Sequence, residues 1–288
     1  MPSEKRQRQR EMRDVRRQEM LRAKRRKDAV RRAIILAVLG LVAGGLIFAS
    51  TRADDDQNVA TNAGSTTTAK GQSAARAKPV TAGREITGDT PCPPGSGDVE
   101  RVKKFEKAPP MCIDPTKTYT ATFATTEGSV KVTLDSSAPG TVNNFVVLAR
   151  YKYYDGSSLH RTDPSIAIIQ GGAPTTQSAS DPGPGYTIPD EGVAATRTYS
   201  EGDLVMARTQ GPNSGGGQFF FVTGPEASAL NGTPDNPSGG TYVTFGKVAD
   251  GLEVLKKIIK LHKEDPSSGL GGAPKRVVII KSVKINES

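Results

Sequence analysis

The chain has 288 residues, of which 24% are charged and 35% hydrophobic, an ordinary composition for a soluble protein with one large or two small domains. Its net charge of +9 lies at one end, because residues 1–32 contain 14 Lys/Arg and 5 Asp/Glu while the rest of the chain contains 25 of each. This distribution excludes a basic surface spread over the whole protein. The two cysteines and two histidines form no metal-binding cluster in the sequence, so we expect neither a metal nor a cofactor.

The basic tail, residues 1–32, precedes an uncharged apolar segment, residues 33–50. Eighteen helical residues span about 27 Å, close to the thickness of the bilayer core. The sequence therefore predicts one transmembrane helix in the cell membrane, and the positive-inside rule places the tail in the cytoplasm and the later residues outside. A signal peptide has a similar apolar core, but the 32 residues ahead of it are long for such a segment. Since no groove-reading motif accompanies the charge, we expect the tail to contact anionic lipid and no nucleic acid.

Two further segments precede the regular part of the chain. Residues 51–90 are polar and lack aromatic side chains, which predicts a disordered linker. Residues 91–117 are rich in proline and contain the only cysteines, Cys92 and Cys112. An extracytoplasmic location permits disulfides, so we predict that these two cysteines are joined and close a loop of about 20 residues.

Residues 118–288 have the periodicity of a mainly β domain. Apolar side chains alternate from Tyr119 to Leu134 on both sides of Glu127-Gly128, which predicts a β-hairpin. The other predicted elements are a helix over 139–156, a helix over 250–261 and a closing strand over 276–285. Many short strands with two helices favour a closed antiparallel barrel whose ends are capped by the helices.

Short motifs follow one another between Tyr119 and Ile285. They are Leu159-His160-Arg161, Gln170-Gly171-Gly172, Met206-Ala207-Arg208, Gly211-Pro212-Asn213, Gln218-Phe219-Phe220 and Phe245-Gly246-Lys247-Val248. In this order they resemble the cyclophilin family of peptidyl-prolyl cis-trans isomerases, especially its bacterial branch. The resemblance implies an eight-stranded closed barrel and an enzyme that rotates the peptide bond before proline.

The resemblance also implies the residues of the active site. Arg161, Gln170 and Gln218 would be catalytic, with Arg161 donating a hydrogen bond to the prolyl nitrogen and the glutamines positioning Arg161 and the peptide. The substrate-binding residues would be Phe220, Ile168, Leu230 and Tyr242, which line the proline pocket, together with Ala207 and Arg208. We expect residues 215–217, three glycines, to form a tight turn rather than a phosphate-binding nest, because the Lys-Ser/Thr ending of a P-loop does not follow them.

The chain departs from the family pattern beside the proline pocket. Eight residues separate Arg161 from Gln170, and the expected pocket phenylalanine is replaced by Ile166 or Ala167. Residues 231–240 lengthen the loop next to the pocket.

Two functions are consistent with this pattern. The first is a membrane-anchored peptidyl-prolyl isomerase that acts outside the membrane on proline-containing segments of exported proteins as they fold. The alternative is a membrane-tethered module or holdase that binds proline-containing peptides with little turnover. The presence of Arg161 together with both glutamines favours the enzyme.

Overall fold

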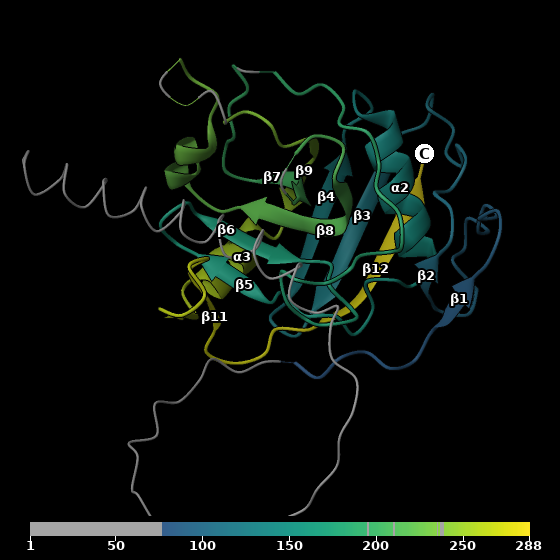
Figure 1. Ribbon diagram of the computed structural model, residues 1–288, viewed down its shortest axis with the longest axis horizontal. Coiled ribbons are helices and arrows are strands. Elements are labelled where there is room, and N and C mark those ends of the chain that lie inside the picture. The colour runs from purple at the N-terminus through teal and green to yellow at the C-terminus, as the bar shows by residue number, and fades with distance from the viewer. Residues whose placement is uncertain (1–76, 195, 210, 235, 237–238) are drawn as a thin grey trace, which may run out of the picture. The chain divides into compact units, whose positions relative to one another are not determined.

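The computed structural model describes residues 77–288 except 195, 210, 235 and 237–238, and this part of the chain is mainly β (Figure 1). Its strands are β1 (Arg84–Ile86), β2 (Val102–Phe105), β3 (Tyr119–Thr125), β4 (Ser129–Leu134), β5 (Arg161–Asp163), β6 (Ile168–Gly171), β7 (Asp203–Arg208), β8 (Gly215–Val222), β9 (Thr244–Asp250), β10 (His262–Glu264), β11 (Gly272–Pro274) and β12 (Ile280–Glu287). Its helices are α2 (Pro139–Arg150), α3 (Leu252–Ile259) and the 3-10 helix η1 (Pro225–Leu230).

The predicted transmembrane segment, residues 33–50, lies outside the described residues, as do the basic tail and most of the predicted linker. Among the described residues, none of the helices combines the length and the apolar character needed to cross a membrane. β1 lies within the last residues of the segment predicted as a linker, residues 51–90.

Ten strands form one antiparallel sheet in the order β10-β11-β5-β6-β8-β7-β9-β4-β3-β12. The predicted closed eight-stranded barrel is therefore wrong, because the strands at the two ends of this sheet, β10 and β12, do not pair with each other. The outer edge of β5 is occupied by β11, through Gly272 and Thr162. Each edge of a strand pairs with one neighbour, so β12 does not pair with the edge of β5 that β11 occupies. Next to this edge, the chain before β12 and the chain before β5 meet in an isolated bridge between Ser158 and Ile279.

The predicted hairpin is confirmed as β3 and β4. Alternate residues of both strands are buried, including Phe123 on β3 and Val132 on β4, as a sheet with one face on the core requires. Both predicted helices are present but shorter than expected. α2 is followed by turns from residue 151, and α3 begins only after Gly251, whose φ of +85° favours glycine.

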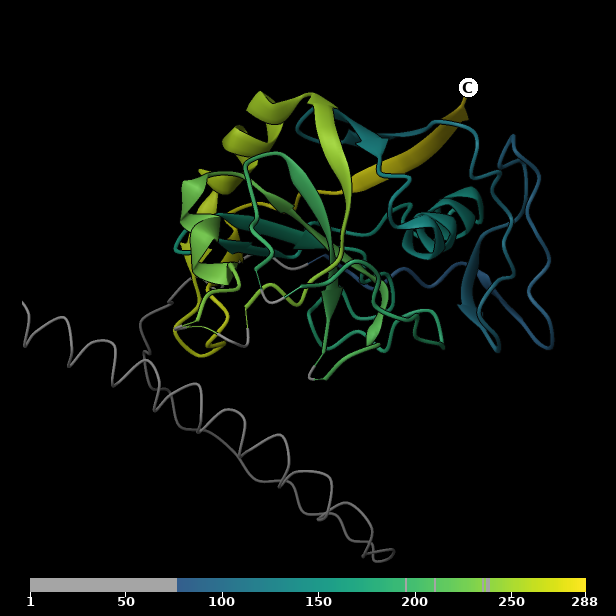
Figure 2. The ribbon, with the colours of Figure 1, turned by 90° about the horizontal axis from the view of Figure 1, so that it is seen from above.

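Helix α2 is covered on two sides. Figures 1 and 2 both place it between the ten-stranded sheet and the two-stranded parallel sheet of β1 and β2. Every residue from Thr141 to Arg150 is buried, including the polar Asn143 and Asn144. Their side chains hydrogen-bond to the backbone of neighbouring segments, which compensates for the loss of water.

Strand β8 separates two apolar clusters. Phe219 and Phe221 lie on one face and are fully buried in the main core, where their rings contact Phe123. Phe220 lies on the other face, since side chains alternate along a strand, and belongs to a second, smaller cluster. The buried members of this second cluster are Ile168, Tyr199, Val205, Phe220, Val222 and Ala227.

The three glycines at residues 215–217 do not form the predicted turn, because they are the first residues of β8. Their lack of a side chain serves close packing instead. A Cβ atom on Gly217 would lie 2.7 Å from the hydroxyl oxygen of Tyr153, and one on Gly216 would lie 3.2 Å from the carbonyl oxygen of Tyr186. Larger residues would push these neighbours off the strand.

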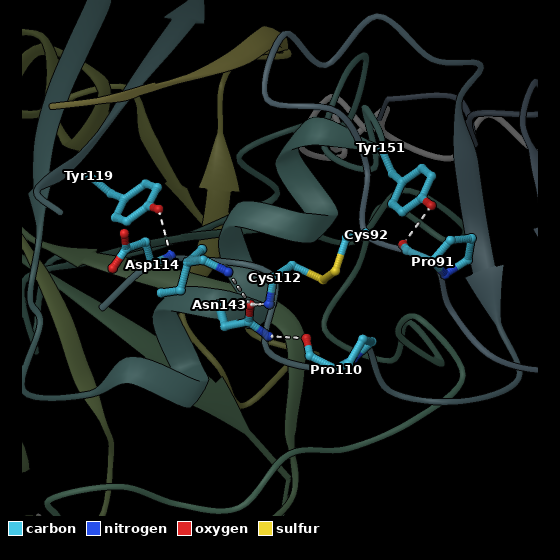
Figure 3. Close-up of a disulfide and its surroundings, with 9 residues drawn as sticks. Pro91, Cys92, Pro110, Cys112, Asp114, Tyr119, Asn143 and Tyr151 are labelled. Atoms are coloured by element: carbon cyan, nitrogen blue, oxygen red, sulfur yellow. Dashed lines mark hydrogen bonds between the residues drawn. A yellow bond between two sulfur atoms is a disulfide. The ribbon is translucent and has the colours of Figure 1, made fainter. Parts of the chain in front are cut away.

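The predicted disulfide between Cys92 and Cys112 is present in the structure, with a Cα–Cα distance of 5.4 Å (Figure 3). The segment that it closes is attached to α2 by the side chain of Asn143. Its Oδ1 atom accepts a hydrogen bond from the Cys112 backbone N–H, and its Nδ2 atom donates to the Pro110 carbonyl. The disulfide thus joins the two ends of residues 92–112, and Asn143 holds the Cys112 end of this segment against the helix.

An ion pair joins the β3–β4 turn to the chain before β12. Glu127 accepts two hydrogen bonds from the Arg276 guanidinium, at 2.8 and 2.7 Å, and is paired with Lys257 at 3.1 Å. The hydrogen bond from Arg276, followed by that from Lys257, lowers the pKa of Glu127 to about 2.

We predict that this ion pair makes the free energy of unfolding dependent on pH in the acid range. The folded-state pKa lies below the ordinary value of 4.5, so the stabilisation is complete above about pH 4.5 and is lost as the pH falls toward 2. The loss is about 1 kcal/mol, because both cationic side chains are more than half exposed to water. Chemical unfolding of Glu127→Gln across this range should show a weaker pH dependence than that of the unchanged protein. Equal slopes would contradict the prediction.

Candidate active site

Arg161 lies at the start of β5 with a side chain that is only 18% exposed. Its guanidinium donates three hydrogen bonds: from Nε to the Leu270 carbonyl at 2.6 Å, from Nη1 to Gln170 Oε1 at 3.0 Å and from Nη2 to Asp163 Oδ2 at 3.2 Å. Three acceptors from different parts of the chain therefore fix the orientation of this planar group.

The side-chain amides of the two predicted glutamines continue the hydrogen bonds of Arg161, and we call these two linked amides the amide chain. Gln170 lies directly opposite Arg161 in the β5–β6 register, and its Nε2 atom donates to Gln218 Oε1 at 2.9 Å. Gln218 in turn donates to the Ala179 carbonyl at 3.2 Å. The predicted catalytic residues are thus brought together.

The predicted proline pocket coincides with the second apolar cluster. Phe220 and Ile168 are buried members of that cluster, and Leu230, Tyr242 and Ala207 pack against it while remaining partly exposed. The Tyr242 ring contacts that of Phe220 edge-on, with centroids 5.5 Å apart. The guanidinium carbon of Arg208 lies 5.3 Å from the centre of the Tyr242 ring, a cation–π distance. Eight of the nine predicted site residues therefore lie in or against this cluster or in the chain of hydrogen bonds from Arg161 through the two glutamines, and Arg208 joins them through its contact with Tyr242.

Ile166 and Ala167, the two candidates for the position of the expected pocket phenylalanine, lie in different surroundings. Ile166 is partly buried and packs against the second cluster. Ala167 is buried with a φ of +49° and accepts hydrogen bonds from Thr223 through its carbonyl, so it belongs to a tight connection before β6. An aliphatic side chain, and not a phenylalanine, thus packs against the second cluster at this point of the chain.

Sequence reasoning missed two partners of Arg161. Asp163 is two residues further along β5, and this spacing places both side chains on the same face of the strand, a signal that could have been used. Leu270 is 109 residues away from Arg161 in the sequence and contributes only its backbone carbonyl, which leaves no sequence signal.

The electrostatic environment of Arg161 is a balance of two effects. Burial lowers the pKa of its guanidinium, because a charged group loses hydration, and the nearby Asp163 carboxylate opposes this shift. Arginine starts from so high a pKa that it stays protonated at neutral pH. Because Arg161 pairs with Gln170 and Gln170 pairs with Phe220 across neighbouring strands, the site presents a largely buried positive charge beside the second apolar cluster.

A cavity of about 140 Å³ adjoins the amide chain. Gln170, Gln218, Ala207 and Arg208 line it together with residues of the segment 181–187, which we call the groove loop; within this segment, residues 181–184, 186 and 187 line the cavity. A larger cavity of about 530 Å³ lies between residues 113–119, the start of α2 and β9, and contains none of the predicted site residues. Within residues 77–288, apart from the gaps given above, no cluster of His, Cys, Asp and Glu is arranged to hold a metal ion.

We predict that Asp163→Asn lowers kcat by about three- to tenfold with little change in KM, because a neutral acceptor holds the guanidinium less firmly than a carboxylate does. Steady-state kinetics on a proline-containing peptide would measure this. Asp203→Asn is a matched control, since Asp203 is a buried carboxylate paired with Lys247 at 2.7 Å and lies outside the site. The control should lose stability and keep its kcat. A kcat that falls equally in both variants would show that Asp163 acts only through stability.

The chain is similar in sequence to known proteins over the region that contains these residues. The family model described as "Cyclophilin type peptidyl-prolyl cis-trans isomerase/CLD" matches residues 120–285. Peptidyl-prolyl cis-trans isomerase B of Bacillus subtilis is 41% identical over 122 residues, which cover 42% of this chain and 76% of that protein. The protein of the same name from Escherichia coli is 34% identical over 173 residues, covering 58% of this chain and 99% of that protein.

Among solved structures, a Cryptosporidium parvum cyclophilin type peptidyl-prolyl cis-trans isomerase is similar with a TM-score of 0.48 and 28% identity, over 59% of this chain and 99% of that one. The family match covers more than half of the chain and runs from within β3 to within β12. The chain therefore belongs to the cyclophilin-type peptidyl-prolyl cis-trans isomerases, and it is an enzyme of that activity.

Proposed function

We propose that Arg161 accelerates prolyl isomerisation by donating a hydrogen bond to the prolyl nitrogen as the peptide bond twists. The observation that carries this role is the position of its guanidinium, held by three acceptors beside the apolar cluster around Phe220. Three of the five guanidinium N–H groups make these bonds, which leaves two for a bound peptide. Gln170 and Gln218 orient the guanidinium and the peptide, while Phe220, Ile168, Leu230 and Tyr242 receive the proline ring.

The chemistry needs no proton transfer. Rotation about the peptide bond has a barrier of ~18 to 20 kcal/mol, because the nitrogen lone pair is delocalised into the carbonyl. Twisting localises that lone pair on nitrogen, where it becomes a better hydrogen-bond acceptor, so a donor aimed at it stabilises the transition state more than the ground state.

The magnitudes are consistent with this mechanism. A rate of ~10³ per second corresponds to a barrier of about 13 kcal/mol, so the site must supply roughly 6 kcal/mol. A charge-assisted hydrogen bond contributes ~1.5 to 3 kcal/mol. Desolvation of the peptide bond and binding in the apolar pocket must supply the rest of this reduction in the barrier.

We place the domain outside the cell membrane, near the membrane surface, where its substrates are proline-containing segments of exported proteins that are folding. The disulfide between Cys92 and Cys112 supports this location, since such bonds persist in oxidising compartments. The basic residues 1–32 support a cytoplasmic N-terminus. Protease added to intact cells should degrade an epitope in the domain and leave an N-terminal tag intact. A protected domain would overturn this location.

The isomerase mechanism can be tested with full-length protein and a blocked peptide that contains one Xaa-Pro bond. Two-dimensional exchange NMR measures the interconversion of the cis and trans peptides directly, so it requires no coupled protease. We expect catalytic amounts of enzyme to speed the exchange, a step that otherwise takes tens of seconds. Saturable binding without faster exchange would instead favour a binding module.

A further inference from the structure

The segment closed by the disulfide, residues 92–112, precedes the region matched by the family model, residues 120–285. It contains strand β2, which pairs in parallel with β1. In Figures 1 and 2 this small sheet lies on the side of α2 that faces away from the ten-stranded sheet. We call residues 92–112 the disulfide-closed segment.

Phe105, the last residue of β2, touches the groove loop. Its backbone N–H donates a hydrogen bond of 2.7 Å to the Pro184 carbonyl. Its ring packs edge-on against Tyr186, with centroids 6.1 Å apart. Gly185 lies between these two loop residues, and a Cβ atom there would overlap the Phe105 carbonyl oxygen. The loop and the end of β2 are therefore in direct backbone contact.

The groove loop lies between this contact and the cavity beside the amide chain. Pro184 and Tyr186 line the cavity and also meet Phe105. The loop has no helix or strand of its own, and it contains two glycines with positive φ, Gly183 at +75° and Gly185 at +104°. A loop of this kind has many accessible conformations, so contacts from outside must select the one observed.

The disulfide-closed segment is anchored on α2 at several points. Its β2 strand is held by a hydrogen bond from the Val102 N–H to the Tyr151 carbonyl at 3.0 Å. The two ends are held near the disulfide by Asn143, as described above, and by the Tyr151 hydroxyl, which donates to the Pro91 carbonyl (Figure 3). Phe105 also packs against the Tyr151 ring, at 5.4 Å between centroids. β2 therefore has a fixed position from which to hold the loop.

We propose that Phe105, positioned by the disulfide-closed segment, holds the groove loop in its binding conformation and so determines how well the enzyme uses the residues that flank the substrate proline. This inference rests on the proposed function, since it requires the peptide to run from the proline pocket into the adjoining cavity. The ligand class is a polypeptide extending beyond Xaa-Pro, because the cavity is lined by backbone and polar groups as well as by Tyr186. Loss of this support leaves the loop held by fewer contacts, among them the hydrogen bond from the Tyr186 hydroxyl to Asn144, so more of its order must be gained each time a peptide binds.

The test compares two blocked peptides in the exchange NMR assay with full-length enzyme. One contains Ala-Pro alone, and the other carries the same Ala-Pro with several residues on both sides. Phe105→Ala removes the contact from the strand side, and Gly185→Ala disrupts it from the loop side without emptying the core. We expect both variants to lower kcat/KM by about five- to tenfold on the longer peptide and by less than about twofold on the short one.

Each variant has a matched control. Phe245→Ala removes an equally buried ring from the main core, where it packs against Phe145. Gly88→Ala places a side chain at a glycine with a φ of +79° where nothing lies within 4 Å of the added Cβ atom. Neither control should change the ratio of kcat/KM between the two peptides by more than about twofold.

The outcomes separate this inference from the proposed function. Equal losses on the two peptides, or no loss on the longer one in either variant, would overturn the role of Phe105. If Phe105→Ala fails to fold, Gly185→Ala tests the same contact by itself, because it removes no side chain from the core. An unchanged enzyme that catalyses exchange of neither peptide would contradict the proposed function itself.

Discussion

Arg161→Ala should lower kcat and kcat/KM together, by about 30- to 1,000-fold, while the affinity for a proline-containing peptide changes little. The reason is that the guanidinium interacts with the twisted amide more strongly than with the planar one. Removing an interaction made mainly in the transition state costs about 2 to 4 kcal/mol of barrier and little ground-state binding. Exchange NMR gives the rate, and calorimetry of peptide binding gives the affinity.

Two further variants make this test specific. Arg161→Lys keeps the charge and loses the planar group that bonds to Leu270, Gln170 and Asp163, so it should recover little of the activity. Arg150→Ala removes another buried arginine, one paired with Glu287 at 2.7 Å and lying outside the site, and should affect stability alone. Activity of Arg161→Ala equal to that of the unchanged enzyme would contradict the proposed mechanism.

The same mechanism predicts a flat pH profile. Burial lowers the pKa of Arg161 and Asp163 opposes that shift, but an arginine stays protonated throughout the neutral range. Because the proposed step transfers no proton, the rate should be nearly constant between about pH 6 and 9. A profile that follows the titration of a histidine would be inconsistent with this prediction.

Phe220→Ala should raise KM strongly and also lower stability. Phe220 is 3% exposed and lies in the apolar cluster at the site, so its removal leaves a cavity and costs about 3 to 5 kcal/mol of unfolding free energy. The same change removes the surface that receives the proline ring. Peptide binding by calorimetry and thermal unfolding would measure the two effects separately.

Phe221→Ala is the matched control, because Phe221 is the next residue of β8 and points into the main core instead. It should lose a similar amount of stability and keep its peptide affinity. If either protein unfolds, the leucine variants at the same two positions preserve most of the volume and allow the same comparison. A similar rise in KM at both positions would mean that Phe220 acts only through stability.

The local arrangement of the site follows from sequence patterns. Alternation along β8 places Phe220 opposite to Phe219 and Phe221, since successive side chains point to opposite faces. Antiparallel pairing of two short strands brings Arg161 and Gln170 opposite each other across the β5–β6 connection. The hairpin of β3 and β4 follows from its period of two in the same way. These features depend on residues close in sequence, so a single sequence determines them.

Other features of the fold and of the site depend on contacts between segments that are far apart in the chain, and only the tertiary structure shows them. The sheet stays open because β11 occupies the edge of β5, and neither strand contains more than three residues from which such pairing could be predicted. The glycines at 215–217 are strand residues of β8, where Gly215 pairs with Arg208, and side chains there would collide with Tyr153 and the groove loop. The Leu270 carbonyl reaches Arg161 and the disulfide-closed segment reaches the groove loop through backbone atoms, which carry no sequence signal. Short elements have little propensity of their own, so long-range contacts determine where they lie.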